Sequence, residues 1–164
     1  MIKRASTLAF AVFLMIFQSA LFSFLPIEFS KPDVGVPCII YATFFLSPVD
    51  GLATAFLVGV AQEMLSVGPQ GALLFTKIFL FLSCIFLRSR LYIESQYLFA
   101  AISSAFVLLE SVLFIALAFF GKGEAVAVMT VLKFCVPDAV FTGILALFFF
   151  PVLERLKLRP YGAV

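Results

Sequence analysis

Long apolar runs, interrupted only by short turns containing Pro or Gly, constrain the fold of this chain more than any other feature. The 164 residues are 64% hydrophobic and only 12% charged, with a mean hydropathy of +1.21. A soluble domain is usually about half apolar and about a quarter charged, and a disordered chain is poorer in apolar residues. Because too little polar surface remains to cover a globule in water, the composition predicts one integral membrane domain over residues 1–164.

The apolar runs are continuous rather than alternating, which favours helices over a lipid-facing barrel. About 20 helical residues cross the apolar core of a bilayer. We therefore expect an all-α membrane protein, a compact bundle of six transmembrane helices. The expected spans are Ala5–Leu25, Val34–Ser47, Gly51–Val67, Ala72–Leu87, Tyr97–Phe120 and Ala125–Phe150.

The first two spans each admit a second interpretation. A charged start followed by an apolar run could be a secretory signal. However, Ala5–Leu25 is long for a signal core, and Pro26–Phe29 offers no small-residue cleavage site, so we interpret the run as a retained span. Val34–Ser47 reaches only about 21 Å as a helix. It either extends into its flanks or forms a re-entrant pair with the next run, from which the turn signal of Ser47–Gly51 separates it.

Six crossings place both termini on the same side of the membrane. The positive-inside rule predicts that this side is the cytoplasm, because nearly all of the basic residues outside the spans then lie there. The cytoplasmic segments would carry Lys3, Arg4, Arg88, Arg90, Arg155, Lys157 and Arg159, against Lys31 and Lys122 outside. The basic tail is expected to contact anionic lipid headgroups, or alternatively a cytoplasmic partner.

Several absences narrow the chemistry. The sequence has no His, which removes imidazole metal ligands and Ser-His or Cys-His nucleophile pairs. Its three cysteines, Cys38, Cys84 and Cys135, lie in apolar runs and are expected to be small packing residues. We find no phosphate-binding loop, no metal-ligand cluster and no basic cluster for nucleic acid. We therefore predict a protein that is not an enzyme and has no cofactor.

Five ionisable residues lie within the expected spans, where a charge costs about 2.5–3.5 kcal/mol on insertion scales. They are Glu63, Lys77, Glu110, Lys133 and Asp138. Similar depths suggest two interhelical ion pairs, Glu63–Lys77 and Glu110–Lys133, with Asp138 left over or sharing Lys133. These charges could form a proton or ion relay, but the favoured interpretation is that they join neighbouring helices.

Other signals concern helix packing. Ser103 and Glu110, like Ser104 and Ser111, are seven residues apart and form a polar stripe that should face other helices. Pro137 should kink the last span. The small residues Ala55 and Gly59, and likewise Ala139 and Gly143, are spaced to permit close helix approach.

The region from Pro32 to Arg90 resembles the rod-shape-determining membrane protein MreD family. The shared pattern is a Pro-Asp pair, a Gly-punctuated helix, an acidic residue, a Gly-Pro-x-Gly turn and a helix that ends in basic residues. In this sequence these are Pro32-Asp33, Gly51 and Gly59, Glu63, Gly68-Pro69-Gln70-Gly71, and Arg88 with Arg90. The acidic position is often Asp in the family, so Glu63 is a mild departure.

The resemblance implies a subunit of the bacterial cell-elongation machinery in the inner membrane. Its implied partners are MreC, the MreB filament, and the RodA glycosyltransferase with its class B penicillin-binding transpeptidase. It also implies a fold similar to the substrate-binding components of energy-coupling-factor vitamin transporters, which supplies a second hypothesis: a small-molecule-binding subunit. Assembly is favoured because the expected outer loops carry few polar residues for a binding pocket. Asp33 is expected to cap the second span.

Overall fold

The computed structural model describes residues 33–65, 71–120 and 125–155, and the regular structure in these ranges is all helical. The helices are α2 Gly35–Phe45, α3 Pro48–Leu65, α4 Ala72–Arg88, α5 Gln96–Phe120 and α6 Ala125–Arg155. The predicted all-α fold is confirmed for this part of the chain. The first predicted span, Ala5–Leu25, lies outside the described residues.

Among the described residues, two helices are long and apolar enough to cross a membrane. These segments are Gln96–Leu117 of α5 and Lys133–Val152 of α6, and they match the fifth and sixth predicted spans. By contrast, α2 has only 11 residues, roughly 16 Å of helix, which is about half the thickness of a bilayer core. The total of six crossings and the side on which the termini lie stay predictions.

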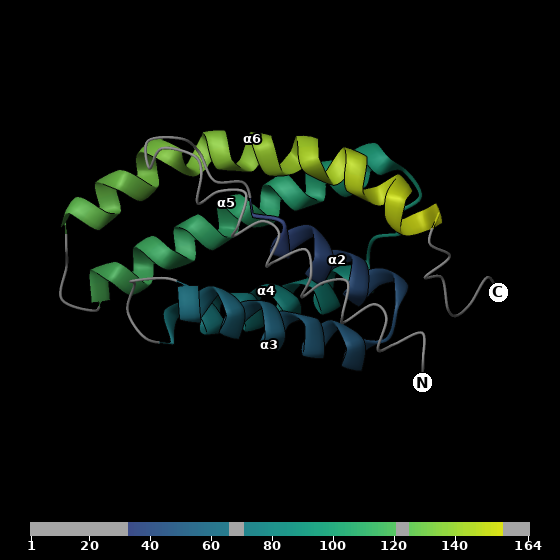
Figure 1. Cartoon of the computed structure of the whole chain (residues 1–164), viewed down its shortest axis with the longest axis horizontal. Coiled ribbons are helices and arrows are strands. Elements are labelled where there is room, and N and C mark those ends of the chain that lie inside the picture. Colours follow the sequence, from purple (N-terminus) through teal and green to yellow (C-terminus); the bar gives the residue numbers. More distant parts are fainter. Residues whose placement is uncertain (1–32, 66–70, 121–124, 156–164) are drawn as a thin grey trace.

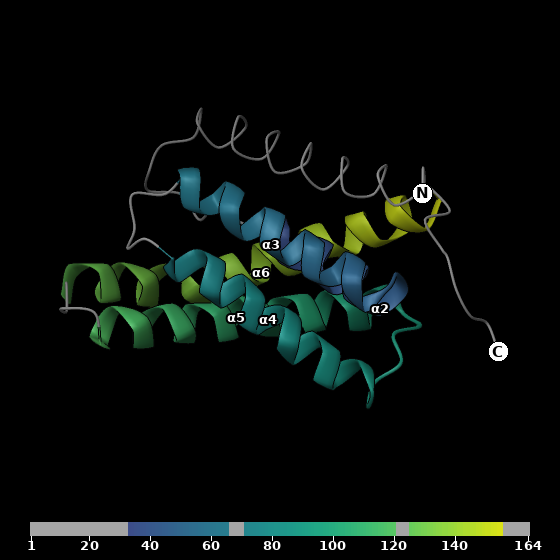
Figure 2. The ribbon, with the colours of Figure 1, turned by 90° about the horizontal axis from the view of Figure 1, so that it is seen from below.

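The short helix α2 lies at the centre of the bundle, between the α5–α6 pair and the α3–α4 pair (Figure 1), and packs against all four. Every residue from Gly35 to Thr43 is buried. Seen from below, α3 and α4 run obliquely across α5 and α6 (Figure 2).

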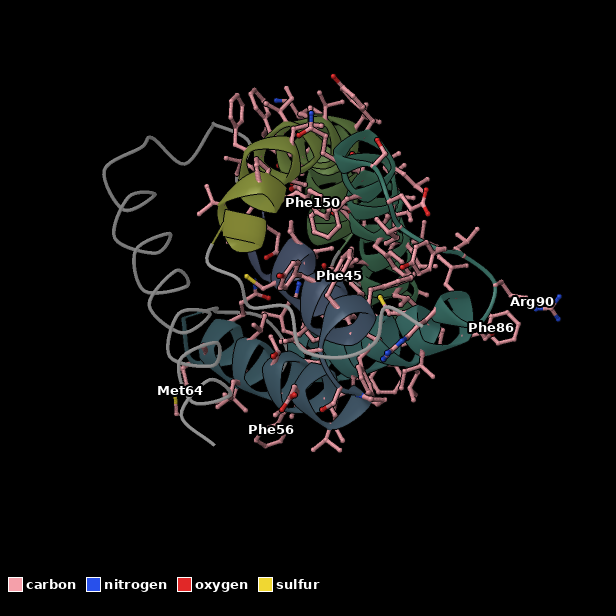
Figure 3. The ribbon with its side chains drawn as sticks, turned by 90° about the vertical axis from the view of Figure 1, so that its right-hand side faces the viewer. Phe45, Phe56, Met64, Phe86, Arg90 and Phe150 are labelled. Carbon is pink, nitrogen blue, oxygen red and sulfur yellow. The ribbon has the colours of Figure 1, made fainter. Side chains whose placement is uncertain are left out.

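Aromatic packing closes one end of this core. The rings of Phe45 on α2 and Phe150 on α6 meet edge to face, with centroids 5.7 Å apart. Figure 3 shows these two rings in the interior, whereas Phe56, Met64 and Phe86 point outward.

The break between α2 and α3 is shorter than predicted. We expected Ser47–Gly51 to form a turn, but α3 already begins at Pro48. The Ser47 hydroxyl accepts a hydrogen bond from the Asp50 amide (3.2 Å) and donates one to the Asp50 carboxylate (2.7 Å). This is a helix-capping arrangement with Pro in the first turn, where its missing N–H costs nothing. The same residues that suggest a turn therefore start a helix.

The last helix also differs from the prediction at its end. The predicted span stopped at Phe150 because Pro151 follows, but α6 continues through Pro151 to Arg155. Pro137 also lies inside this continuous helix, which Figure 1 shows bowed over the bundle. A single Pro removes one backbone hydrogen bond, and a long, packed helix tolerates that loss with a bend.

Candidate functional site

Lys77 is the centre of a charged network inside the bundle. It lies in the second turn of α4, and its side chain is 0% exposed. The ammonium group forms ion pairs with the carboxylates of Asp33 and Glu110, the latter at 2.5 Å. A buried ammonium without partners would cost several kcal/mol, so these contacts are what allow Lys77 to occupy the interior.

Asp33, just before α2, connects the network to three more elements. Its Oδ1 atom accepts hydrogen bonds from the Gly35 amide (2.7 Å) and from the side-chain amide of Gln62 on α3 (2.9 Å). Its Oδ2 atom accepts from Lys77, and its backbone N–H donates to Thr142 Oγ1 on α6 at 3.0 Å. The N-cap position of α2 is Val34 rather than Asp33, but the Asp33 carboxylate accepts a hydrogen bond from the first amide of α2 and is also the anion that faces Lys77.

Glu110 adds α5 to the helices that the network connects. It lies near the middle of α5, its side chain is 13% exposed, and Oε1 contacts Lys77. The network thus ties together α2, α3, α4, α5 and α6. Its charged members are two carboxylates and one ammonium.

The predicted pair Glu63–Lys77 is wrong, because Lys77 contacts Asp33 and Glu110 instead. The carboxylate of Glu63 accepts hydrogen bonds from the backbone amides of Gly71 and of Leu74, the latter at 3.2 Å. Glu63 therefore satisfies free N–H groups at the start of α4, where the helix dipole also favours a negative charge. The pair was predicted because Glu63 and Lys77 have similar expected depths in their spans. Depth alone does not show in which direction each side chain points.

The predicted pair Glu110–Lys133 is also wrong. Glu110 is paired with Lys77, and Lys133 is exposed, with its ammonium 5.5 Å from the centroid of the Phe134 ring. Asp138 is half-buried on α6, and its predicted sharing of Lys133 stays a prediction.

Four of the described residues of the family-like pattern, Asp33, Gly59, Glu63 and Gly71, gather around the first turns of α4, whereas Gly51 lies at the start of α3 and Arg88 and Arg90 lie at the end of α4. Asp33 contacts Lys77, and Glu63 binds the Gly71 amide. Gly71 has φ +87°, a left-handed conformation that favours glycine. A Cβ atom on Gly59 would lie 3.0 Å from the Cα atom of Leu74, so glycine is what lets α3 approach α4 this closely. Pro32 and Pro69 lie outside the described residues.

The predicted close approach of the last helix is confirmed. A Cβ atom on Gly143 would lie 2.2 Å from Ser104 Oγ on α5. On the predicted polar stripe, Ser103 is fully buried and donates to the carbonyl of Phe99 at 2.8 Å. The stripe therefore faces the bundle, as expected.

Sequence reasoning missed the hydrogen bonds of three polar residues, namely Gln62, Thr142 and Arg88. Gln62 donates a hydrogen bond to the Asp33 carboxylate, and Thr142 accepts one from the Asp33 backbone N–H. At the other end of α2 the Arg88 guanidinium donates to the carbonyl of Thr43 at 2.8 Å. A usable signal was the cap prediction, which already placed Asp33 directly before the second span. No comparable signal marks Gln62 or Thr142.

Within the described ranges, no group of three His, Cys, Asp or Glu side chains is placed to hold a metal ion. Comparisons with protein-family models, with curated proteins and with solved structures give no match to this chain. The fold and the site define a helical bundle with a buried, mutually paired charge network.

Proposed function

We propose that this chain is a non-catalytic membrane subunit of the bacterial cell-elongation complex, resident in the inner membrane as a multi-pass protein. In this proposal it binds MreC and supports peptidoglycan synthesis by the RodA glycosyltransferase and its class B penicillin-binding transpeptidase, alongside MreB. The proposed topology has six crossings, with both termini in the cytoplasm.

One observation carries the structural half of this proposal: Lys77 is fully buried between Asp33 and Glu110. The charges of the site are directed at one another, and the polar groups around them complete hydrogen bonds between helices. Such an arrangement holds helices in one relative position, which is what a subunit that presents a fixed surface to partners requires.

The pattern shared with the MreD family supports the other half. Four of its described members, Asp33, Gly59, Glu63 and Gly71, act on a single junction, where α3 meets the start of α4 and Asp33 meets Lys77. Residues that are scattered over the sequence thus serve one structural purpose. Since these residues shape the bundle in this chain, the resemblance in this pattern favours the same type of bundle.

The described surface of α3 and α4 includes large exposed apolar side chains. Side chains on α3 and α4 that face away from the bundle include Phe56 (50% exposed) and Leu82 (56% exposed). In a membrane such faces meet lipid chains or the helices of partner proteins.

Affinity capture of the tagged full-length chain from bacterial inner membranes, followed by mass spectrometry, tests this function. We expect recovery of MreC together with the synthase pair. Recovery of an ATPase pair with a coupling subunit would contradict assembly and favour the small-molecule transporter alternative. A purified chain that turned over a substrate unaided would contradict the non-catalytic assignment.

A further inference from the structure

Among the residues that the structure describes, the charged network has one negative charge more than it has positive charges. Asp33 and Glu110 both contact Lys77, and the remaining hydrogen-bond partners of Asp33, namely Gln62, Thr142 and Gly35, are uncharged. With both acids ionised, the interior of the bundle would hold an uncompensated anion. Carboxyl groups in apolar surroundings avoid this cost by taking up a proton.

The two acids differ in how well each accommodates a negative charge. Asp33 receives donors from the Gly35 amide, the Gln62 amide and Lys77, and it lies at the N-terminal end of α2, where the helix dipole favours an anion. Glu110 lies in mid-helix on α5, where the backbone amides are already bonded within the helix, and among the described residues its carboxylate is paired with Lys77 alone. The proton therefore belongs on Glu110.

We propose that Glu110 carries a proton in the assembled bundle, so that the network of Asp33, Lys77 and Glu110 is electrically neutral. Lys77 then donates to Oε1 of Glu110, and the proton occupies the second carboxyl oxygen. Release of this proton places an excess negative charge between α4 and α5 and weakens their contact. The network is thus a proton-sensitive joint between the α2–α3–α4 group and the α5–α6 pair.

In the part of the chain whose side chains are described, no other group on the helices that pack against α5 supplies the missing positive charge. The other titratable or charged groups there are Cys38 and Tyr41 on α2, Cys84 and Arg88 on α4, and Lys133, Cys135 and Asp138 on α6. Only Arg88 and Lys133 among them are cations. The Arg88 guanidinium donates to the carbonyl of Thr43 at the other end of α2, and Lys133 is exposed near the Phe134 ring.

Infrared spectroscopy of the purified full-length chain in lipid nanodiscs tests the proposal directly. We expect the carbonyl band of a protonated carboxylic acid at neutral pH, absent from Glu110→Gln and kept in Glu94→Gln, a matched control at an exposed acid in the α4–α5 connection. A wild-type spectrum without this band would overturn the proposal. So would a band of equal strength in Glu110→Gln.

A second variant separates charge balance from simple burial. Asp33→Asn leaves one carboxylate and one ammonium, so Glu110 should release its proton and the band should disappear, although Glu110 itself is unchanged. Persistence of the band in a folded Asp33→Asn protein would contradict the charge-balance argument.

Replacing sodium by choline at constant pH should leave the wild-type band unaltered. A band that was weaker in sodium than in choline would contradict the proposal, because a sodium ion rather than a proton would then balance the charge of Glu110.

Thermal unfolding against pH gives a further readout from the same samples. A folded chain that binds one proton more than the unfolded chain loses stability as pH rises. The wild type should therefore be destabilised at alkaline pH relative to its own value at neutral pH, and Glu110→Gln should lose less. Equal alkaline losses in the two proteins would count against a bound proton at Glu110.

Discussion

At the scale of single residues, the site depends on where each polar atom is directed. Glu63 and Lys77 lie on adjacent helices, yet Glu63 turns to the amides of Gly71 and Leu74 while Lys77 turns to Asp33 and Glu110. The first interaction caps a helix, and the second neutralises buried charge. Glu63 and Glu110 therefore have different roles although both are glutamates: Glu63 caps α4, and Glu110 pairs with the buried Lys77.

The capping role of Glu63 predicts a moderate loss of stability on substitution. Glu63→Ala removes acceptors from the first turn of α4 and should cost about 1 kcal/mol in the free energy of unfolding, the usual size of a lost helix cap. A double-mutant cycle with Lys77→Met, measured by denaturant unfolding in detergent, should show little coupling between the two residues. A coupling energy as large as that between Lys77 and Asp33 would restore the pairing of Glu63 with Lys77.

At the scale of helices, glycines permit close approach, and two of them, Gly59 and Gly143, differ in what would block a larger residue. At Gly59 the obstacle includes the backbone Cα atom of Leu74, 3.0 Å from an added Cβ atom, and at Gly143 it is the hydroxyl of Ser104. A hydroxyl can rotate away, whereas backbone cannot move without shifting its helix. The two glycines therefore tolerate substitution differently.

Gly59→Ala should accordingly destabilise the protein more than Gly143→Ala does. We expect a loss of about 1–3 kcal/mol for Gly59→Ala, the typical cost of overpacking, and a smaller loss for Gly143→Ala. In thermal unfolding, Ser104→Ala should restore stability to Gly143→Ala because it removes the obstructing oxygen. A reversed order of the two glycine variants would mean that the α5–α6 crossing is the tighter one.

At the scale of the whole molecule, the sequence predicted the helices well and their mutual placement poorly. Apolar runs located α4 and α5 to within one or two residues, because hydropathy and the turn residues bounding each run are local properties. The positions of Asp33 and Glu110 around Lys77 are not local. They depend on the short α2 lying at the centre of the bundle, which brings a residue from before α2 beside the second turn of α4.

The predicted topology, six spans with both termini in the cytoplasm, is also a property of the whole molecule. Reporter fusions at the amino and carboxyl ends should both show cytoplasmic activity, since an even number of crossings returns the chain to its starting side and the basic residues favour the cytoplasm. Activity of the two reporters on opposite faces of the membrane would contradict the six-span arrangement.

The central claim is that the buried charges hold the helices together, and the free energy of unfolding of Lys77→Met in detergent tests it most directly. Lys133→Met is the matched control, because it makes the same chemical change at an exposed lysine. Lys77→Met should lose about 3–5 kcal/mol, the cost of leaving a buried ionic partner unpaired, and Lys133→Met should stay within about 0.5 kcal/mol of the wild type. Equal stabilities of the two variants would contradict the account.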